Sequence, residues 1–235
     1  MSQSSIQTTA EFDAFAAEYD AMLARGISVS GEDKNYFARG RVAWLARCLA
    51  GSQKHPLTAL DFGCGTGSAT PFLLNELQLE SLVAVDASVQ SLIMARRIYD
   101  DLRVRFVSLA EYRPEGVFDL AFCNGVFHHI PPGDRGNALE LVRRSLRPGG
   151  LFAFWENNPW NPGTQYVMRR IPFDRDAVTL SPPTARHLLT RSGFKVLRTD
   201  FLFFFPRFLS WFRPLEPCLV SLPLGAQYQI LCQRA

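Results

Sequence analysis

The sequence predicts an α/β domain built on a mostly parallel sheet of seven strands with helices on both faces. From residue 57 onward, short runs rich in β-branched and aromatic residues alternate with stretches of helical periodicity, as in strands joined by crossover helices. The chain of 235 residues is also long enough for one sizeable core but short for two. We therefore expect a single domain over residues 1–235.

The expected strands follow one another in a regular order. Each is a short apolar run bounded by turn-forming or helical residues. They lie at residues 57–62, 82–86, 104–107, 118–123, 151–156, 194–205 and 226–233.

Helices are expected between these strands and before the first of them. Apolar residues recur there at spacings of three and four. The Arg147-Pro148-Gly149-Gly150 run should end the helix before the fifth strand and turn the chain. The helices are expected near residues 11–25, 35–49, 69–77, 89–99, 137–146 and 183–191.

The composition excludes several classes of protein. Lysine and arginine number 25 against 22 acidic residues, and they form no basic run, so charge does not indicate a nucleic-acid partner. The five cysteines are odd in number, widely spaced and never in a C-x-x-C pair. They indicate neither a disulfide framework nor a zinc site, so we predict no metal and a reducing cytoplasm.

Neither the first ten residues nor the most apolar segment predicts export or a membrane span. Residues 1–10 are polar, without the basic start and apolar stretch of a signal peptide. The most apolar segment, 201–212, is interrupted by Pro206 and Arg207 and falls short of the roughly 20 apolar residues that cross a bilayer. A cytoplasmic location is expected.

A glycine-rich turn marks the clearest candidate site. Residues 60–70 read LDFGCGTGSAT, an apolar strand that ends in an acid, then a turn and a helix start. Glycines at 63, 65 and 67 permit positive φ and a close approach of a ligand to the backbone. Because Ser68 follows Gly65 by three, the run is G-x-G-x-G and not the G-x-G-x-x-G of dinucleotide sites. The turn predicts a nucleoside-type cradle.

Asp86 is the second candidate. It ends the next strand, about 20 residues after the glycine turn, where a carboxylate can accept hydrogen bonds from both ribose hydroxyls. An acid just before a helix can also serve as its N-cap. The sequence leaves both roles of Asp86 open, as ribose contact and as helix N-cap.

The glycine turn, the Asp86 segment and two later motifs together resemble one protein family. In chain order they read LDFGCGTG, VAVDAS, FDLAFCNGVFHHI and LRPGGLFAFWE. The series is similar to that of class I S-adenosylmethionine-dependent methyltransferases, in the small-molecule branch that includes quinone-biosynthesis methyltransferases. The resemblance covers roughly residues 12–193 and implies a Rossmann-like fold with S-adenosylmethionine as cofactor. We accordingly expect a helical lid over residues 1–52, a cofactor-binding core over 57–156, and substrate-side elements with a short insertion over 157–235.

The family's binding residues carry over onto matching positions. The glycine turn and the acid before it would hold the methionine moiety, and Asn124 with Gly125 would lie beside the methyl group. Many relatives have an acid after the third strand that meets the adenine; here Leu109 stands there, so backbone groups near it would replace that contact. Tyr19, beside Asp20 in the lid, would cap the methionine end, although it also fits a helix core. The implied cofactor residues are Asp61, Gly63, Cys64, Gly65, Gly67, Asp86, Ala87, Leu109, Ala110, Asn124, Gly125 and Tyr19.

Three ionisable residues are candidates for handling an acceptor proton. His128 and His129 follow the fourth strand and Glu156 ends the fifth, at the edge where open α/β sheets bind ligands. Histidine titrates near neutrality, and a general base is needed only if the acceptor holds a proton. The alternative is that the histidines only line the site.

Residues 157–162, NNPWNP, invite comparison with the N-P-P-[YFW] motif of methyltransferases that act on nucleic acid. That motif follows the fourth strand, whereas this segment follows the fifth. We interpret the stretch 157–181 as an irregular substrate-side loop, with a rigid turn as the alternative for its first residues.

The C-terminal region has the most unusual composition. Residues 201–205 are expected to complete a buried strand, and about 20 residues then intervene before the last strand, more than a hairpin needs. This insertion carries Phe208, Trp211 and Phe212 among basic residues and prolines, and predicts one or two short amphipathic turns. It fits a core or oligomer contact, or else a lipid-like acceptor pocket or a membrane surface.

The function expected from the sequence is methyl transfer from S-adenosylmethionine to oxygen, nitrogen or carbon of a small, hydrophobic or aromatic acceptor. A non-catalytic cofactor-binding partner subunit is the alternative, since it would keep the glycine turn and Asp86. A nucleic-acid methyltransferase is disfavoured by the missing basic patch. The acceptor and the oligomeric state stay open.

Overall fold

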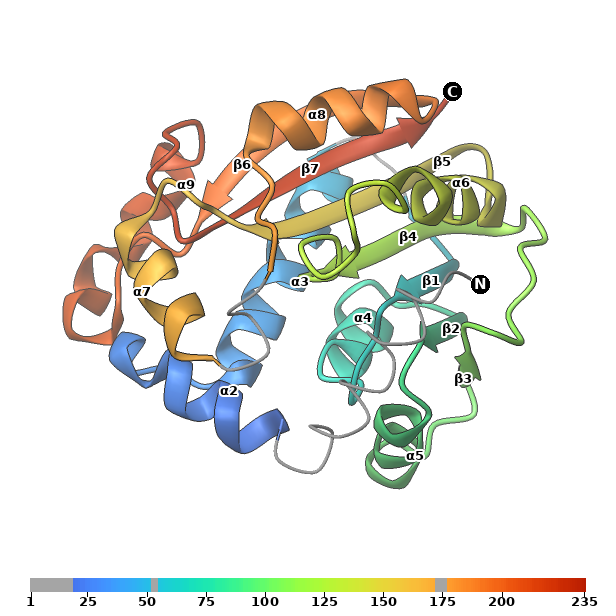
Figure 1. Ribbon diagram of the computed structural model, residues 1–235, viewed down its shortest axis with the longest axis horizontal. Coiled ribbons are helices and arrows are strands. Elements are labelled where there is room, and N and C mark those ends of the chain that lie inside the picture. Colours follow the sequence, from blue (N-terminus) through green and yellow to red (C-terminus); the bar gives the residue numbers. More distant parts are fainter. Residues whose placement is uncertain (1–18, 52–54, 172–176) are drawn as a thin grey trace.

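A sheet of seven strands forms the centre of the protein in a computed structural model, which describes residues 19–51, 55–171 and 177–235 (Figure 1). Its order is β3-β2-β1-β4-β5-β7-β6, and only β7 runs antiparallel to its neighbours β5 and β6. This arrangement confirms the expected Rossmann-like α/β class. The strands are β1 (Thr58–Phe62), β2 (Ser81–Asp86), β3 (Val104–Ser108), β4 (Phe118–Asn124), β5 (Leu146–Asn157), β6 (Phe194–Leu202) and β7 (Gln227–Arg234).

Helices cover both faces of this sheet (Figure 1). Before β1 come α2 (Tyr19–Ile27), η1 (Ser28–Ser30) and α3 (Lys34–Gly51). The others, in chain order, are α4 (Thr70–Glu76), α5 (Val89–Ile98), α6 (Arg135–Ser145), α7 (Pro162–Arg170), α8 (Pro182–Arg191), η3 (Arg207–Leu215) and α9 (Glu216–Leu219).

Two apolar layers hold the helices to the sheet. On one face, Leu45 of α3 and Leu73 of α4 pack with Trp155 of β5, all fully buried. On the other face, Leu139 of α6 and Leu189 of α8 pack in one core, also fully buried. Complete burial of each such side chain stabilises the fold by roughly 1.5–3 kcal/mol. This packing fixes the positions of the strand ends, from which the loops leave the sheet.

The direction of strand succession reverses between β1 and β4. The chain passes outward from β1 to β2 and β3, then returns to add β4 on the other side of β1. In open α/β sheets a crevice forms at the carboxyl ends of the strands at this point. The glycine turn after β1 and the loop after β4 both begin there.

The structure corrects three sequence expectations. The stretch 157–181 is not wholly irregular, because α7 forms within it: Asn161 Oδ1 accepts the Thr164 N–H at 2.9 Å as N-cap, and Pro162 occupies the first turn. The sixth strand ends at Leu202 and not at 205, because Phe203 takes a positive φ of 63° and turns the chain. The fifth strand begins early, at Leu146, so the 147–150 run expected to turn the chain lies inside β5, beside a register irregularity against β4, and the helix expected at 137–146 ends at Ser145.

The insertion forms the expected short helical turns, η3 and α9. Neither contains a buried side chain, so the core alternative for this segment is wrong, whereas the oligomer contact and the lipid-facing role stay predictions. The helix expected at 11–25 lies mostly outside the described residues, which begin with α2. In the described part of the chain, no helix is both long and apolar enough to cross a membrane.

Candidate functional site

A cavity of about 640 Å³ opens at the carboxyl ends of β1 and β4. Helices α2 and α3 form one wall, and the glycine turn with the loop after β4 forms the floor. The remaining wall comes from α7 and from residues 203–206, which follow β6. The cavity therefore lies between the glycine turn expected to bind the cofactor and the elements α2, α3 and α7.

The glycine turn is fastened to β2 and open toward the cavity. The N–H groups of Gly63 and Cys64 both donate to the Val85 carbonyl, at 2.8 and 3.0 Å. Gly63 has a φ of 76°, and a Cβ there would overlap the Val126 side chain. Gly65 has a φ of 53°, but a Cβ there would meet no atom within 4 Å. A side chain at Gly65 would thus project into ligand space and not into protein.

Asp61 presents a buried carboxylate to this cavity. It is 2% exposed, and its Oδ2 has no hydrogen-bond partner among the described residues. Burial, and next the nearby charge of Asp86, raise the pKa of Asp61 to about 7. The Thr66 hydroxyl is likewise buried beside the cavity and without a partner in the described part. Buried polar atoms of this kind fit a ligand that brings a cation or hydrogen-bond donors.

Asp86 ties the glycine turn to the end of β2. Its Oδ2 accepts the Gly65 N–H at 2.7 Å and its Oδ1 accepts the Ser88 N–H at 2.8 Å. The N-cap of α5 is Ser88, whose hydroxyl accepts the Ser91 N–H, so the alternative prediction of Asp86 as N-cap is wrong. A carboxylate offers about four lone pairs, so these contacts leave acceptor capacity for a ligand hydroxyl.

The residues that the resemblance implies for the adenine gather beside Asp86. The Leu109 N–H donates to the Asp86 carbonyl at 2.8 Å, which brings the ends of β2 and β3 together. Leu109 is half-buried, and both Ala87 and Ala110 are exposed. None of these four residues contributes to the wall of the main cavity. They form a separate edge next to the glycine turn.

Glu156 lies behind His128 and orients its ring. His128 Nδ1 and Glu156 Oε2 are 2.6 Å apart, and both side chains are almost fully buried. The other oxygen, Oε1, accepts the N–H of Phe127 at 2.8 Å. This contact fits an Nδ1–H that donates to Glu156 Oε2, and it fixes the orientation of the His128 ring. His128 lines the cavity, whereas Glu156 does not.

Arg135 ties the loop after β4 to residue 178. Its Nε donates to the Ile130 carbonyl at 2.9 Å and its Nη2 to the Val178 carbonyl at 2.6 Å. Desolvation lowers the pKa of this guanidinium, and the charge of Glu156 opposes the change. His129 also lines the cavity, with its ring centroid 4.0 Å from that of His128.

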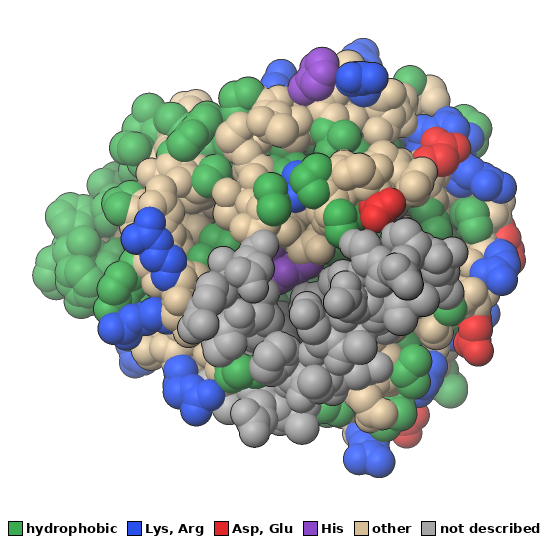
Figure 2. Space-filling view, viewed as in Figure 1, with side chains coloured by type: hydrophobic (Ala, Val, Ile, Leu, Met, Phe, Trp, Pro, Cys, Tyr) green, Lys and Arg blue, Asp and Glu red, His purple; other side chains and the backbone are tan. Residues whose placement is uncertain are grey.

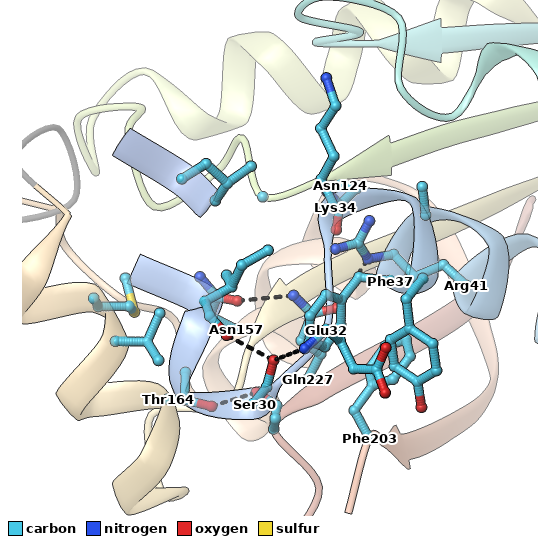
Figure 3. A pocket seen from close by; sticks show the side chains of 18 of the residues that line it. Ser30, Glu32, Lys34, Phe37, Arg41, Asn124, Asn157, Thr164, Phe203 and Gln227 are labelled. Carbon is cyan, nitrogen blue, oxygen red and sulfur yellow. Dashed lines mark hydrogen bonds between the residues drawn. The ribbon is translucent and has the colours of Figure 1, made fainter. Parts of the chain in front are cut away.

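The opposite wall combines a polar row with aromatic rings (Figure 3). The Arg41 Nε donates to Gln227 Oε1 at 2.9 Å, and Gln227 Nε2 donates to Asn157 Oδ1 at 3.1 Å. Phe37 and Phe203 meet edge to face with centroids 5.0 Å apart. Arg41, Gln227 and both rings were not predicted as site residues, because they come from α3, β7 and the end of β6 and share no local motif.

The structure brings most, but not all, of the predicted residues into one place. Gly67 packs against Tyr99 instead of facing the cavity, and the side chain of Tyr19 lies outside the described part. The described residues contain no group of three or more side chains suited to hold a metal ion. The predicted residues that line the cavity are Asp61, Gly63, Cys64, Gly65, Asn124, Gly125, His128 and His129.

Comparisons with known proteins agree with this geometry. Residues 60–152 match a family model described as a methyltransferase domain. A trans-aconitate 2-methyltransferase of Azoarcus sp. is 30% identical over 115 residues, which cover 49% of this chain and 45% of that protein. A trans-aconitate 2-methyltransferase of Pseudomonas aeruginosa is 30% identical over 172 residues, covering 72% of this chain and 58% of that protein. The chain thus spans about half the length of these curated relatives.

A solved structure extends the likeness to nearly the whole chain. A SAM-dependent methyltransferase from Thermotoga maritima superposes with a TM-score of 0.66 over 97% of this chain and 100% of that one. The two sequences are 19% identical, so this likeness concerns the fold.

The tautomer of His128 provides a direct test of the pair with Glu156. We expect long-range proton–nitrogen NMR spectra to show His128 protonated at Nδ1 in the wild type, because Glu156 Oε2 accepts there. In Glu156→Ala this preference should disappear, whereas the exposed His187 should give the same spectrum in both proteins. A His128 spectrum that is unchanged in the variant would contradict the pairing.

The raised pKa of Asp61 predicts a pH dependence of stability. Between about 3.9 and about 7 the unfolded chain releases the Asp61 proton while the folded protein keeps it, so stability falls as pH rises through this window. Asp61→Asn should remove this loss and stabilise the unliganded protein more at pH 8 than at pH 5, measured by urea unfolding.

Asp100→Asn provides the control, because it makes the same substitution at an exposed position. If Asp61→Asn changes the free energy of unfolding equally at both pH values, the carboxyl is not buried as described.

Proposed function

We propose that this chain, which belongs to the class I S-adenosylmethionine-dependent methyltransferases, transfers a methyl group from S-adenosylmethionine to a small-molecule acceptor. The observation that carries the proposal is the buried Asp61 carboxylate, whose Oδ2 has no hydrogen-bond partner among the described residues, beside the open face of Gly65 at the strand ends where the cavity begins. A site that leaves these groups unsatisfied in the protein is suited to a ligand with a cationic end and a nucleoside body.

The residues at the strand ends fit that cofactor. Asp61 and Thr66 would receive the amino and carboxyl end of its methionine moiety, and the backbone at Gly63 and Gly65 would lie against its chain. Asp86 would accept from the ribose hydroxyls, with Ala87, Leu109 and Ala110 at the adenine. Asn124 and Gly125 line the cavity and would lie at the methionine end beside the methyl group. When bound, the cofactor would supply an electrophilic methyl group.

The chain's own contribution is to position the acceptor and to exclude water. We assign His128 the role of taking an acceptor proton, since it lines the cavity while Glu156 holds its Nδ1–H. Glu156 would act through His128 as a positioning residue, because it does not reach the cavity. His129 would contact the acceptor from the adjacent position.

The acceptor that this cavity favours is amphipathic. Aromatic rings of Tyr36, Phe37 and Phe203 provide an apolar wall. Arg41, held by Gln227, places a planar guanidinium on the same wall, and this group suits a carboxylate or another anionic end. We therefore propose an acceptor with an apolar or lipid-like body and a polar or anionic end. Trans-aconitate, which the relatives' name gives as their acceptor, has anionic ends and no apolar body. Methylation of trans-aconitate would therefore show whether the anionic end alone is sufficient.

A substitution at Gly65 tests the cofactor site. Gly65→Val should weaken S-adenosylmethionine binding on the order of 100-fold or more in a calorimetric titration, because its side chain would fill the space that the ligand needs. Gly149→Val is the matched control: Gly149 has a similar positive φ of 76° but lies away from the cavity. It should lose comparable thermal stability yet bind normally. Equal binding by both variants would overturn the cofactor assignment.

Substitutions at the histidines test the proton-transfer role. With methyl-labelled S-adenosylmethionine, a panel of apolar carboxylic acids, phenols and trans-aconitate should reveal a transferring acceptor. For that acceptor, His128→Ala should lower kcat by roughly 10²-fold, and Glu156→Gln should lower it less and shift its pH profile. His187→Ala, on the exposed face of α8, should have no effect.

Full turnover by His128→Ala would mean that catalysis proceeds by proximity alone. Normal cofactor binding with no transfer to any acceptor in the panel or in a cell extract would favour the non-catalytic partner subunit.

A further inference from the structure

The segment η3–α9 with the loop after it carries an exposed apolar surface that no part of the methyl-transfer site uses. Neither helical turn contributes a buried side chain. We call this surface the apolar projection; its exposed members are Phe208, Trp211, Phe212, Leu215, Leu222 and Leu224. Figure 1 shows the segment at one end of the molecule beside α7, and Figure 2 shows hydrophobic side chains gathered at that end.

The exposure of this projection is unusual for aromatic residues. Phe208 is 70% exposed and Trp211 is 72% exposed. Scattered single apolar residues are normal on a surface, but a continuous patch of this kind marks an interaction site. The ring centroids of Trp211 and Phe212 lie 5.9 Å apart, and Phe212 lies 5.5 Å from Phe205, so the patch is continuous with the cavity wall.

The exposed charges of the segments that flank the projection are positive. Residues 157–171 and 203–226 contain Arg169, Arg170, Arg207 and Arg213 and a single acid, Glu216. Arg213 is paired with Glu32 at 2.8 Å, so the other three arginines supply the uncompensated charge. Glu216 is half-buried and turns inward, where its Oε1 accepts the Phe205 N–H at 3.1 Å. Arg169, Arg170 and Arg207 are exposed. In Figure 2, Lys and Arg side chains border the apolar end, while the acidic side chains lie at the other end of this face.

Aromatic rings with a basic border match the chemistry of an anionic bilayer surface. Trp and Phe enter the boundary between headgroups and acyl chains, and arginine pairs with lipid phosphates beside them. A purely apolar protein partner would need no such border of one charge sign. We propose that the apolar projection docks this protein on anionic lipid bilayers.

Docking in this way would turn the cavity mouth toward the bilayer. Residues 203–206 run from the cavity wall directly into η3. Val29 and Tyr166 also line the cavity and are 45% and 47% exposed, which gives the mouth an apolar rim. An amphipathic acceptor could then pass from the membrane into the cavity; this last step rests on the proposed function, whereas the docking does not.

Vesicle binding by the full chain without cofactor or acceptor tests the docking. The protein should co-sediment with vesicles of phosphatidylcholine containing phosphatidylglycerol and bind pure phosphatidylcholine more weakly. Phe208→Ser with Trp211→Ser should reduce partition into the anionic vesicles roughly tenfold or more. Arg207→Gln should reduce it about fivefold and weaken its salt dependence.

The matched control is Ile98→Ser with Leu102→Ser, which removes two exposed apolar side chains near α5, distant from the projection. This variant should bind vesicles as the wild type does. Tryptophan emission should shift to shorter wavelength on vesicle addition, and Trp211→Phe should abolish most of the shift, because Trp211 is the most exposed tryptophan of the described chain.

Two results would overturn the proposal. One is equal partition by the wild type and the Phe208, Trp211 double variant. The other is a wild type that does not bind vesicles but is a dimer in light scattering, while the double variant is a monomer. That result would assign the face to a second copy of the chain. Because no arm measures methyl transfer, a failure of docking and a failure of the proposed activity remain distinguishable.

Discussion

The hydrogen bond from the Gly65 N–H to the Asp86 carboxylate, 2.7 Å long, holds the glycine turn against the end of β2. The three glycines of the turn have no side chains to pack, and Cys64 is the turn residue that packs into the core. Two further bonds from Gly63 and Cys64 to the Val85 carbonyl complete the attachment. The cavity floor, and with it the placing of any ligand between β1 and β4, depends on this attachment.

Fixing the turn in this way keeps the half-buried Asp86 carboxylate near the buried Asp61. Backbone donors order Asp86, whereas Asp61 Oδ2 has no partner in the described part of the chain and the pKa of Asp61 is raised to about 7. An uncompensated buried group of this kind costs stability in the unliganded protein. A cationic ligand group would offset that cost, so the same feature that weakens the empty fold would strengthen binding.

The two sides of the cavity are built differently. The cofactor side arises from consecutive residues of single βα turns, which short-range chemistry specifies. The opposite side is assembled from α3, α7, β7 and the residues after β6, and its polar row joins Arg41 to Gln227 across 186 positions of sequence. A scaffold of this type can keep one cofactor turn while its other wall varies with the acceptor.

Local pattern by itself determined the α/β class, the positions of the strands, the glycine turn and Asp86, because strand periodicity and positive-φ glycines are properties of neighbouring residues. It did not determine that α7 forms, that β6 stops at Phe203, or that Glu156 stands behind His128. Those outcomes depend on which distant groups meet: Glu156 Oε2 finds His128 Nδ1 only because β4 and β5 pair in parallel. Likewise, only the tertiary structure decided that Phe208 and Trp211 face outward, since an amphipathic segment buries its apolar side only where the fold offers a partner for it.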